Sequence, residues 1–329
     1  MSKPFSGKEA VYFIEPTNIC NLNCEMCPTN REMKRKKGFM DYDIYRRTID
    51  SFVEAKKSKE VYLNLWGWGE PLLHPMIYEM IGYAKKRGVI VRMSSNLDVK
   101  SANKCENIVN SGLDVLLIGL DGMTQESHGK YRTGGNKESV VNNIKEILRI
   151  KREHRQRRPI IAITTILTRY VKPELESLFS FCENSGVDAL LLKLPNLWRS
   201  GKEVSRVENL YEKFIIKEVG QSRYGNRCPT SIDNKTKKRC PFLDKRGIVY
   251  WNGDVTVCCF DHEGDCRFGN IGKEGGIKNI LHGRRGYEAW SRMKSNDYIM
   301  CEYCDSCGER MDMKIYTEES NIKALLKYL

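Results

Sequence analysis

The sequence predicts an α/β protein, a partial (β/α)6 TIM-like barrel followed by a small cysteine-rich module with a β-hairpin and a helix. Short apolar runs rich in branched residues alternate with amphipathic segments whose apolar residues recur every three or four positions. Gly88, Gly112 and Gly186 stand where helices should end, just before the next strand. Six such units in a row imply a parallel sheet with right-handed crossovers, two units short of a full eightfold barrel.

The six expected strands share a short, apolar and branched composition, and they cover residues 11–15, 61–66, 89–95, 114–120, 160–167 and 188–194. The clearest helices between them cover residues 42–57, 75–88 and 135–154. Each of these helices carries one apolar face, which predicts that it packs against the sheet.

The pattern changes after about residue 200, where a charged helical stretch is followed by a connector rich in Gly, Asn and Lys. Asn252 and Gly253 between two apolar runs indicate a β-hairpin, and a helix is expected from about Ile277 to Met293. The expected parts are a barrel domain of residues 1–220, a connector of residues 221–239 and a module of residues 240–329 with a C-terminal helix.

The composition is that of an ordinary globular chain of 329 residues with a net charge of +13. Its basic runs, of which Lys34–Lys37 is one, lack interleaved aromatic residues on which bases stack. We therefore expect solvated side chains there and no nucleic-acid partner. No run of about 18 apolar residues and no secretory leader is present, so we expect a cytoplasmic protein with no membrane partner.

Thirteen cysteines in a cytoplasmic chain indicate metal ligands or catalytic thiols, because structural disulfides are rare in a reducing compartment. Cys20, Cys24 and Cys27 have a C-x3-C-x2-C spacing in the loop after the first expected strand. Three thiolates with no obvious fourth leave one metal position open, and barrel active sites lie at the carboxyl ends of the strands. A zinc site completed by a distant cysteine is the alternative.

The stretch C-N-L-N-C-E-M-C resembles the signature of the radical S-adenosylmethionine (SAM) superfamily, and the resemblance covers about residues 11–310. It implies that Cys20, Cys24 and Cys27 hold three irons of a [4Fe-4S] cluster, while the amino and carboxylate groups of SAM bind the fourth. It also implies an external reductant such as flavodoxin or ferredoxin, and cleavage of SAM to a 5'-deoxyadenosyl radical that takes a hydrogen atom from substrate. Met26 stands where the family often has an aromatic residue against the adenine.

The stretch W-G-W-G-E-P after the second expected strand resembles the Gly-Gly-Glu-Pro motif of the same superfamily. Gly69 and Glu70 match the motif, and Trp68 replaces its first glycine. The resemblance implies that the Glu70 carboxylate accepts a charge-assisted hydrogen bond from the SAM ammonium.

Two later stretches also resemble cofactor-binding elements of the superfamily. Ser95 and Asn96 end the third expected strand where relatives carry a Thr-Asn-Gly turn, which implies contacts to the ribose or carboxylate of SAM, and Leu97 replaces the glycine. After the fourth strand, Asp121 corresponds to a structural or ribose-side residue. Arg132 corresponds to a ligand of the SAM carboxylate, which the guanidinium fork can bind with two hydrogen bonds.

The C-terminal cysteines resemble the auxiliary-cluster extension of the superfamily, called SPASM in its full form and twitch when shortened. Shared features are a cysteine, a hairpin with Asn-Gly-Asp, a second cysteine, G-N-I, a helix and a C-x2-C pair. Because the full C-x2-C-x5-C-x3-C run is absent, the resemblance implies one auxiliary [4Fe-4S] cluster, with a zinc knuckle as the alternative. Its ligands would be Cys240, Cys258 and two of Cys301, Cys304 and Cys307.

Three further cysteines receive separate predictions. Cys105 and Cys182 lie on apolar faces of expected helices and should be small core residues. Cys259 is a candidate donor of a hydrogen atom to a substrate radical. Its neighbour Cys258 is an expected ligand, and adjacent residues of a strand face opposite sides.

These resemblances imply a radical SAM oxidoreductase, either a dehydrogenase or an epimerase. A short barrel with one auxiliary cluster resembles enzymes that oxidise or epimerise aminocyclitols and sugars, so a small polar substrate is expected. Peptide-modifying relatives commonly have an extra N-terminal leader-binding domain, for which the stretch before Cys20 is too short, so a small peptide is the second alternative. A non-catalytic zinc or iron-sulfur protein that binds nucleic acid, with steep salt dependence, is the alternative of another class.

Overall fold

The structure is a computed structural model that describes residues 10–55, 60–193, 195, 197, 204–216, 248–256 and 258–294. Four of the five candidate ligands of the auxiliary cluster, Cys240, Cys301, Cys304 and Cys307, and the expected connector lie outside the described residues.

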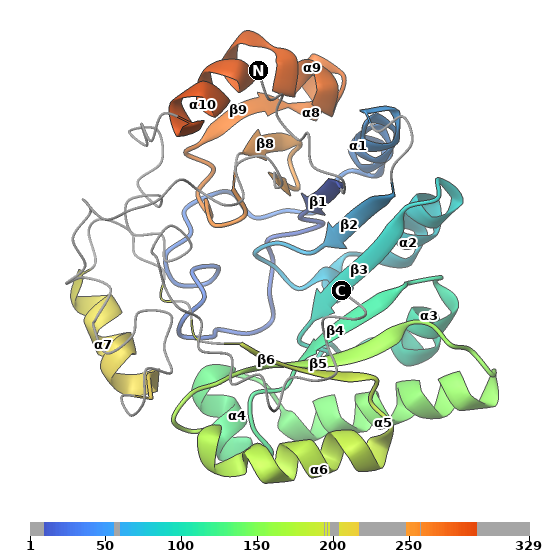
Figure 1. Ribbon diagram of the computed structural model, residues 1–329, viewed down its shortest axis with the longest axis vertical. Coiled ribbons are helices and arrows are strands. Elements are labelled where there is room, and N and C mark those ends of the chain that lie inside the picture. The colour runs from blue at the N-terminus through green and yellow to red at the C-terminus, as the bar shows by residue number, and fades with distance from the viewer. Residues whose placement is uncertain are drawn as a thin grey trace.

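The first six strands pair in chain order and in parallel, as expected for a partial (β/α)6 barrel (Figure 1). Their bounds differ from the expected ones by one residue at most ends, and they are β1 (Ala10–Ile14), β2 (Val61–Leu65), β3 (Ile90–Ser95), β4 (Val115–Gly119), β5 (Ile160–Ile166) and β6 (Ala189–Lys193). The predicted α/β fold class is confirmed.

Helices cover the outer face of these strands (Figure 1). They are α1 (Tyr42–Ala55), α2 (Ile77–Lys86), α3 (Lys104–Asn110), α4 (Gln125–Tyr131), α5 (Lys137–Glu153) and α6 (Leu175–Ser185), with 3-10 turns η1 (Pro71–Leu73) and η2 (Lys172–Glu174). The three predicted helix-ending glycines, Gly88, Gly112 and Gly186, all have positive φ, between 74° and 82°. A glycine adopts this left-handed conformation without the steric cost that a side chain adds.

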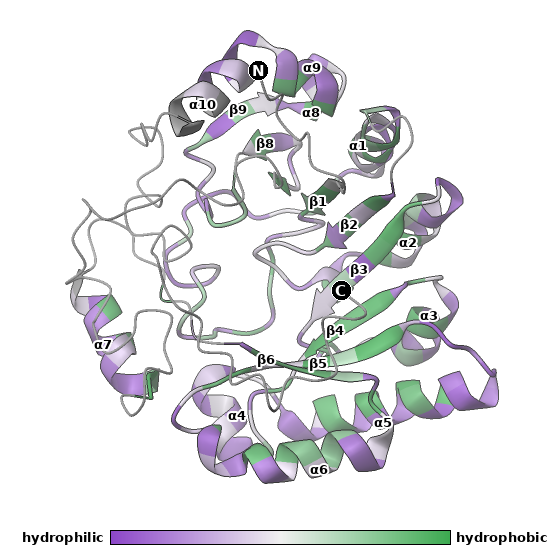
Figure 2. Ribbon diagram, in the orientation of Figure 1, coloured by the Kyte–Doolittle hydropathy of each residue, from purple (hydrophilic) through white to green (hydrophobic). Residues whose placement is uncertain are grey.

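The main core lies between the strands and the helices. Alternate residues of β2, Val61, Leu63 and Leu65, join this core, and the same alternation recurs in the neighbouring strands. Figure 2 shows the corresponding hydrophobic strands and the amphipathic helices around them. The residues between these core positions, such as Asn64, face the opposite, concave side of the sheet, because successive side chains of a strand alternate.

The C-terminal part continues the barrel sheet instead of forming a sheet of its own. Strand β7 (Ile248–Val249) pairs in parallel with β1, with Phe13 opposite Ile248. Strands β8 (Asp254–Thr256) and β9 (Arg267–Asn270) follow in antiparallel order, so that the described residues form one sheet of nine strands. The predicted hairpin is confirmed, and Gly253 takes the positive φ, 84°, that its turn requires.

The prediction of a single helix from about Ile277 to Met293 is wrong, because the structure has two helices there. They are α9 (Ile277–His282) and α10 (Arg284–Lys294), and Gly283 between them is extended, with ψ of 163°. At Gly286 an added Cβ would lie 2.2 Å from the carbonyl oxygen of Ile280, so glycine allows the two helices to meet at a sharp corner. The apolar periodicity predicted the helical conformation of both segments, and the two glycines determine where it breaks.

Two shorter or separate helices complete the described part, α7 (Val204–Phe214) and α8 (Ile271–Glu274). Helix α7 lies inside the charged stretch that the sequence predicts to be helical. Among the described residues, no helix combines the length and the apolar character needed to cross a membrane.

Candidate functional site

The three cysteines of the first motif lie in the loop that leaves the carboxyl end of β1, and all three are half-buried. The amide of Cys27 donates to the carbonyl oxygen of Cys24 at 3.1 Å, which closes a tight turn between them. The amide of Leu22 donates to Sγ of Cys20 at 3.5 Å. The loop that carries the three cysteines therefore follows the carboxyl end of β1, at the edge where the sequence predicts the site.

The thiols lie in one electrostatic environment. Burial, helped by the nearby Glu70, Cys27 and Cys24, raises the pKa of Cys20 to about 12. Burial also raises the pKa of Cys24 to about 11, whereas the Arg132 guanidinium lowers it. Without a metal these two cysteines are thus neutral thiols at pH 7, and a bound metal would displace their protons.

Side chains within and next to the loop hold its backbone. Asn30 donates through Nδ2 to the carbonyl oxygens of Cys20 and Leu22, at 3.2 and 2.6 Å. Arg31 donates to the carbonyl oxygens of Asn23 and Cys24, at 2.8 and 3.3 Å. The loop therefore has a defined course through its own hydrogen bonds.

The loop after β2 approaches the cysteine loop so closely that Gly69 has no room for a side chain. An added Cβ would lie 2.3 Å from the carbonyl oxygen of Thr17 and 2.7 Å from that of Ile19. The amide of Glu70 donates to the same Ile19 oxygen at 2.9 Å. Gly69 and Glu70 therefore lie directly against the backbone that leads to Cys20.

Gly69→Ala is expected to destabilise the protein by about 1–3 kcal/mol, because the new methyl group meets backbone atoms that cannot move aside cheaply. Urea unfolding would measure the change. Gly82→Ala is the matched control, since nothing lies within 4 Å of its added Cβ and alanine favours the interior of α2. An equal change in both variants would contradict the close approach at Gly69.

The Glu70 carboxylate is buried and accepts three hydrogen bonds. Its Oε1 accepts from the amide of Leu72 at 3.0 Å and from the hydroxyl of Ser95 at 2.7 Å, and its Oε2 accepts from the amide of Asn96 at 2.7 Å. Burial raises the pKa of Glu70, while these hydrogen bonds and Arg132 act in the other direction. A carboxylate can accept about four hydrogen bonds, so Oε2 retains room for one more donor.

The predicted cofactor residues Ser95 and Asn96 make contacts within the protein. The Ser95 hydroxyl donates to Glu70 and accepts from the amide of Leu97 at 2.8 Å, and Asn96 donates through Nδ2 to Asn21 at 3.0 Å. They thereby connect Glu70 to the cysteine loop, and their contact with SAM stays a prediction.

Leu97 takes the conformation for which its relatives' glycine is suited. Its φ is +57°, and its side chain is fully buried in the main core. The left-handed conformation costs a branched residue roughly 1–2 kcal/mol, and burial of a leucine side chain contributes about 1.5–3 kcal/mol. The buried side chain thus offsets the backbone strain at this departure from the family pattern.

Asp121 and Arg132 form an ion pair above β4. Arg132 Nε donates to Asp121 Oδ2 at 2.6 Å, and Asp121 Oδ1 accepts from the amide of Ile166. Burial by itself lowers the pKa of Arg132, but Asp121 and Cys24 outweigh it and the pKa is raised. Gly119 provides the space, since an added Cβ there would lie 2.2 Å from Nη2 of Arg132. The hydrogen bond of the Arg132 side chain to a described residue comes from Nε. The two terminal nitrogens donate to no described residue, so they can bind an anion.

His128 makes the stability of this region depend on pH. Burial, helped by Arg132, lowers its pKa from 6.5 to about 4, and Nδ1 accepts from the amide of Asp121 at 3.2 Å. The unfolded chain therefore binds a proton more readily than the folded one between pH 6.5 and 4. Its contribution to stability is full above pH 6.5 and is lost as the pH falls toward 4, by about 1.4 kcal/mol per pH unit.

This prediction is tested by urea unfolding of the wild type and His128→Asn at pH 7 and pH 5. Asparagine keeps an acceptor but does not titrate, so the variant should lose less stability on acidification than the wild type. Parallel losses in the two proteins would show that His128 does not carry the effect.

The remaining predicted site residues, Met26, Cys258 and Cys259, lie next to elements that follow β6 in the chain. Met26 is buried in a cluster with Leu210 and Phe214 of α7, so the structure places it beneath that helix, and its contact with adenine stays a prediction. Cys258 and Cys259 follow β8 and are half-buried. Cys27 and Cys259 both pack against one aromatic cluster, formed by Phe13, Trp68, Ile248 and Tyr250.

Sequence reasoning missed two charged residues beside the site. The basic run Lys34–Lys37 was expected to be solvated, and for Arg35 this is wrong. Its side chain is 11% exposed and forms an ion pair with the fully buried Glu15. No local pattern identifies such a pair, since Arg35 resembles its solvated neighbours and Glu15 follows an apolar strand. The buried positions expected for Cys105 and Cys182 are confirmed.

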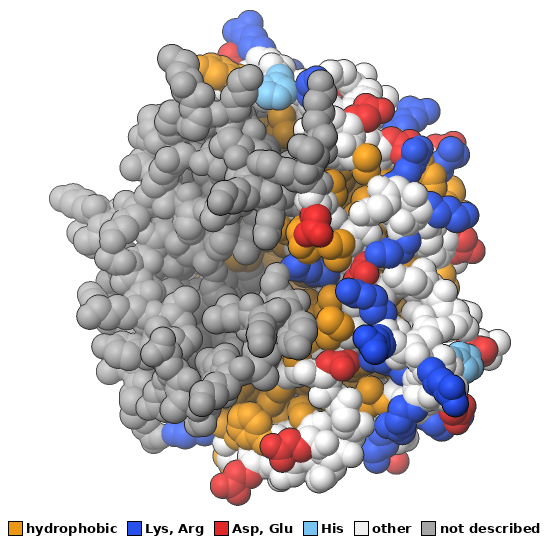
Figure 3. Space-filling model, turned by 45° about the vertical axis from the view of Figure 1, so that its right-hand side comes forward, with side chains coloured by type: hydrophobic (Ala, Val, Ile, Leu, Met, Phe, Trp, Pro, Cys, Tyr) orange, Lys and Arg blue, Asp and Glu red, His pale blue; other side chains and the backbone are white. Residues whose placement is uncertain are grey.

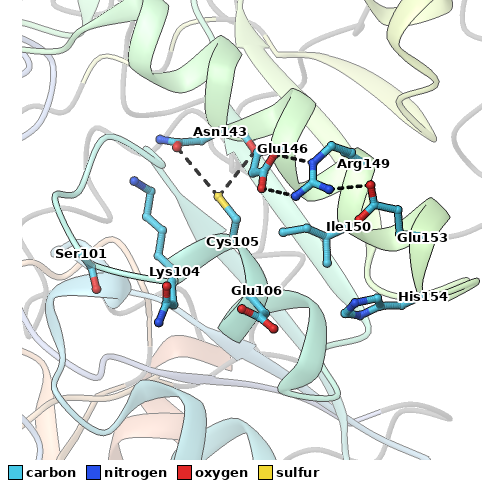
Figure 4. A pocket seen from close by; sticks show the side chains of 11 residues that line it. Ser101, Lys104, Cys105, Glu106, Asn143, Glu146, Arg149, Ile150, Glu153 and His154 are labelled. Atoms are coloured by element: carbon cyan, nitrogen blue, oxygen red, sulfur yellow. Dashed lines mark hydrogen bonds and ion pairs between the residues drawn. The ribbon is translucent and has the colours of Figure 1, made fainter.

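A polar groove of about 490 Å³ lies on the outer side of the barrel, between α3 and α5 (Figure 4). Cys105 lies within 3.8 Å of Asn143, and Arg149 pairs with Glu146 and Glu153 along its wall. The polar groups of these residues pair with one another, and the residues lie on helices away from the cysteine loop. Among the described residues on the face turned forward in Figure 3, Lys and Arg side chains lie together with those of Asp and Glu.

The described donors fit a cluster that shares one iron with SAM. Three thiols face one environment, Glu70 retains an acceptor position and Arg132 retains free donors. Within the described ranges no three His, Cys, Asp or Glu side chains converge on a point where one metal ion would sit.

Comparisons with known proteins agree with this geometry. The family model of the radical SAM superfamily matches residues 14–182, and that of an iron-sulfur cluster-binding domain, SPASM, matches residues 240–308. The chain is 24% identical over 321 residues to the tungsten-containing aldehyde ferredoxin oxidoreductase cofactor-modifying protein of Pyrococcus furiosus. The alignment covers 91% of this chain and 87% of that protein.

Two solved structures share the fold at 14% sequence identity. BtrN in complex with AdoMet and 2-DOIA matches with a TM-score of 0.54 over 93% of this chain and 94% of its own. Native anSMEcpe with bound AdoMet and Kp18Cys peptide matches with a TM-score of 0.59 over 92% and 91%. The chain belongs to the radical SAM superfamily, uses its [4Fe-4S] clusters and S-adenosylmethionine, and carries a SPASM-type iron-sulfur domain.

Proposed function

We propose that this radical SAM enzyme oxidises or epimerises a small polar molecule of the aminocyclitol or sugar class. SAM bound at the first cluster supplies a 5'-deoxyadenosyl radical, which takes a hydrogen atom from substrate. In this proposal Cys20, Cys24 and Cys27 hold the irons, Glu70 accepts a hydrogen bond from the ammonium of SAM, and Arg132 binds its carboxylate. Cys258, together with three cysteines outside the described residues, holds an auxiliary cluster.

The observation that carries the substrate class is a buried polar position on the concave side of the sheet, beside apolar residues such as Val115, Leu117 and Ala162. Asn64 is only 5% exposed, and its Oδ1 has no hydrogen-bond partner among the described residues. Ser94 and Thr164, on β3 and β5, face the same side, because Met93 and Ile163 beside them belong to the main core. A buried polar atom without a partner is costly, so a ligand that donates to Asn64 is favoured. Hydroxyl and amino groups of a small polyol are donors of this kind.

The relatives support a small molecule without naming this one. The name of the Pyrococcus furiosus relative gives a cofactor as the target of modification, and the BtrN structure contains 2-DOIA. The peptide alternative keeps its own support, because the anSMEcpe structure with a bound peptide shares the fold to a similar degree. Membership of the superfamily favours both enzymatic predictions over a nucleic-acid-binding protein.

The test is substrate-dependent formation of 5'-deoxyadenosine by the anaerobically reconstituted protein under reductant. A panel of carbon-deuterated aminocyclitols and amino sugars should include a compound that transfers deuterium into 5'-deoxyadenosine. Asn64→Leu should raise the KM for that compound at least tenfold while background SAM cleavage without substrate is unchanged. Deuterium transfer from a peptide, with none from the panel, would establish the peptide alternative instead.

A further inference from the structure

Glu15 lies at the point where the cysteine loop leaves β1, and it is fully buried. Both of its oxygens accept from Arg35, at 3.0 and 2.9 Å, in a two-pronged pair. Oε2 also accepts from the amide of Trp68 at 3.2 Å, and Oε1 from the amide of Trp251 at 3.5 Å. Four donors occupy the four acceptor positions of one carboxylate.

These donors come from three separate parts of the chain. Arg35 follows the cysteine loop, Trp68 immediately precedes Gly69 and Glu70, and Trp251 lies in the turn between β7 and β8. The Glu15 carboxylate therefore joins the two loops of the SAM side to the hairpin of the iron-sulfur domain. Gly67 permits this approach, because an added Cβ there would lie 2.6 Å from Cβ of Glu15.

Arg35 extends the connection to the segment that follows Cys259. Its Nε donates to the carbonyl oxygen of His262 at 2.6 Å, and its guanidinium lies 4.0 Å from the ring centre of Tyr250. The Glu263 carboxylate accepts from the backbone amides of Lys34 and Arg35, at 2.7 and 3.0 Å. The segment after the third cysteine is thus bound directly to the segment after Cys258 and Cys259.

The cysteines themselves meet the same structure. Cys27 and Cys259 both pack against the aromatic cluster to which Trp68 and Tyr250 belong. Trp68 occupies the position where relatives carry the first glycine of their motif, so its indole ring adds bulk between the SAM side and the hairpin. The ion pair and the aromatic cluster together hold the two cysteine-bearing segments at one separation.

We infer that Glu15 and Arg35 are positioning residues that hold the Cys258–Cys259 segment against the cysteine loop and thereby set the separation of the two clusters. The placement follows from the contacts above. Its consequence for electron transfer rests on the proposed function, in which oxidation of substrate delivers one hydrogen atom to the adenosyl radical, one proton to a base and one electron to the auxiliary cluster. The rate of such an electron transfer depends on the distance between its donor and the auxiliary cluster, so this distance must stay constant.

The first test is hydrogen exchange of the reconstituted protein. In Glu15→Gln and Arg35→Gln, deuterium uptake in residues 258–264 should rise at least tenfold in rate, while β4 and β5 exchange as in the wild type. Removing one partner leaves the other buried and unpaired, which opens the contact. Arg149→Gln, which breaks an exposed pair on α5, is the control and should leave residues 258–264 unchanged. Unchanged exchange in both site variants would overturn the inference.

Glu263→Gln tests the same connection if the buried substitutions prevent folding, because its carboxylate is at the surface end of the contact. It should raise exchange in residues 258–264 without unfolding the barrel. No rise in this variant would also overturn the inference. None of these exchange measurements needs a substrate. They therefore test the inference even if the proposed function is wrong.

The second test separates charge from geometry through the midpoint potential of the auxiliary cluster, measured in a background with Cys20, Cys24 and Cys27 all replaced by alanine. Positive charge near a cluster favours its reduced form. Arg35→Gln should therefore lower the potential, and Glu15→Gln should raise it. Arg35→Lys should restore the potential but not the slow exchange, because lysine keeps the charge and lacks the planar fork. An unchanged potential in both Arg35→Gln and Glu15→Gln would show that the pair does not lie beside the auxiliary cluster and would overturn the inference.

Discussion

Cys24→Ala is expected to abolish reductive cleavage of SAM, with 5'-deoxyadenosine falling at least a thousandfold, while the barrel stays folded. The loss follows because the proposed function assigns Cys24 as one of the three cysteines that hold the first cluster. Cys24 is half-buried in a loop outside the main core, so its replacement costs little packing. Anaerobic reconstitution followed by chromatography of the nucleoside products measures the effect, together with iron and sulfide per chain.

Cys182→Ala is the matched control, because this cysteine is buried in α6 and lies far along the chain from the cysteine loop. It should lose some stability through the small cavity and retain its iron and its cleavage activity. Full cleavage by Cys24→Ala would contradict the ligand assignment. Equal loss in both variants would indicate general damage to the protein instead.

Asp121→Asn is expected to destabilise the protein by about 3–5 kcal/mol, because it leaves the Arg132 charge buried without its partner. Asparagine keeps an oxygen that accepts from the Ile166 amide, so the lost contribution is mainly that of the charge. Urea unfolding at pH 7 would measure the change. The same variant should weaken SAM binding, since Arg132 loses the contact that orients its terminal nitrogens.

Asp43→Asn serves as the control for this substitution. Its side chain is 71% exposed, and its pair with Arg46 is a surface pair at 3.5 Å. Such pairs contribute about 0–1 kcal/mol, so the control should stay close to the wild type. Adding Arg132→Met to Asp121→Asn should recover part of the lost stability. A double variant no more stable than Asp121→Asn would contradict the unpaired-charge explanation.

The fold was largely predictable because its signals are local. Apolar runs and helix-ending glycines such as Gly88 act within a few residues of the positions that they determine. The break at Gly283 was missed because the apolar periodicity of α9 and α10 continues across it, and only the close packing at Gly286 reveals the corner.

The site was predictable in part for the same reason. The spacing of the cysteines and the Gly-Glu-Pro motif are local patterns, and the structure brings Cys20 and Glu70 into one electrostatic environment. What the sequence did not predict are partners between distant segments. Glu15 and Arg35 meet only through folding, and Ser95 bonds Glu70 from another strand. A single sequence carries no signal for which acid meets which base.

The parallel pairing of β1 with β7 also constrains the order of folding. Phe13 pairs with Ile248, so almost the whole barrel is synthesised before this edge of β1 finds its neighbour. Contacts between residues so far apart in the chain form slowly, because a long loop must close first. Until then an apolar strand edge stays open and can pair with another chain. A nascent or truncated chain that ends before residue 248 therefore exposes the edge along which it would aggregate, and the hairpin of the iron-sulfur domain closes that edge.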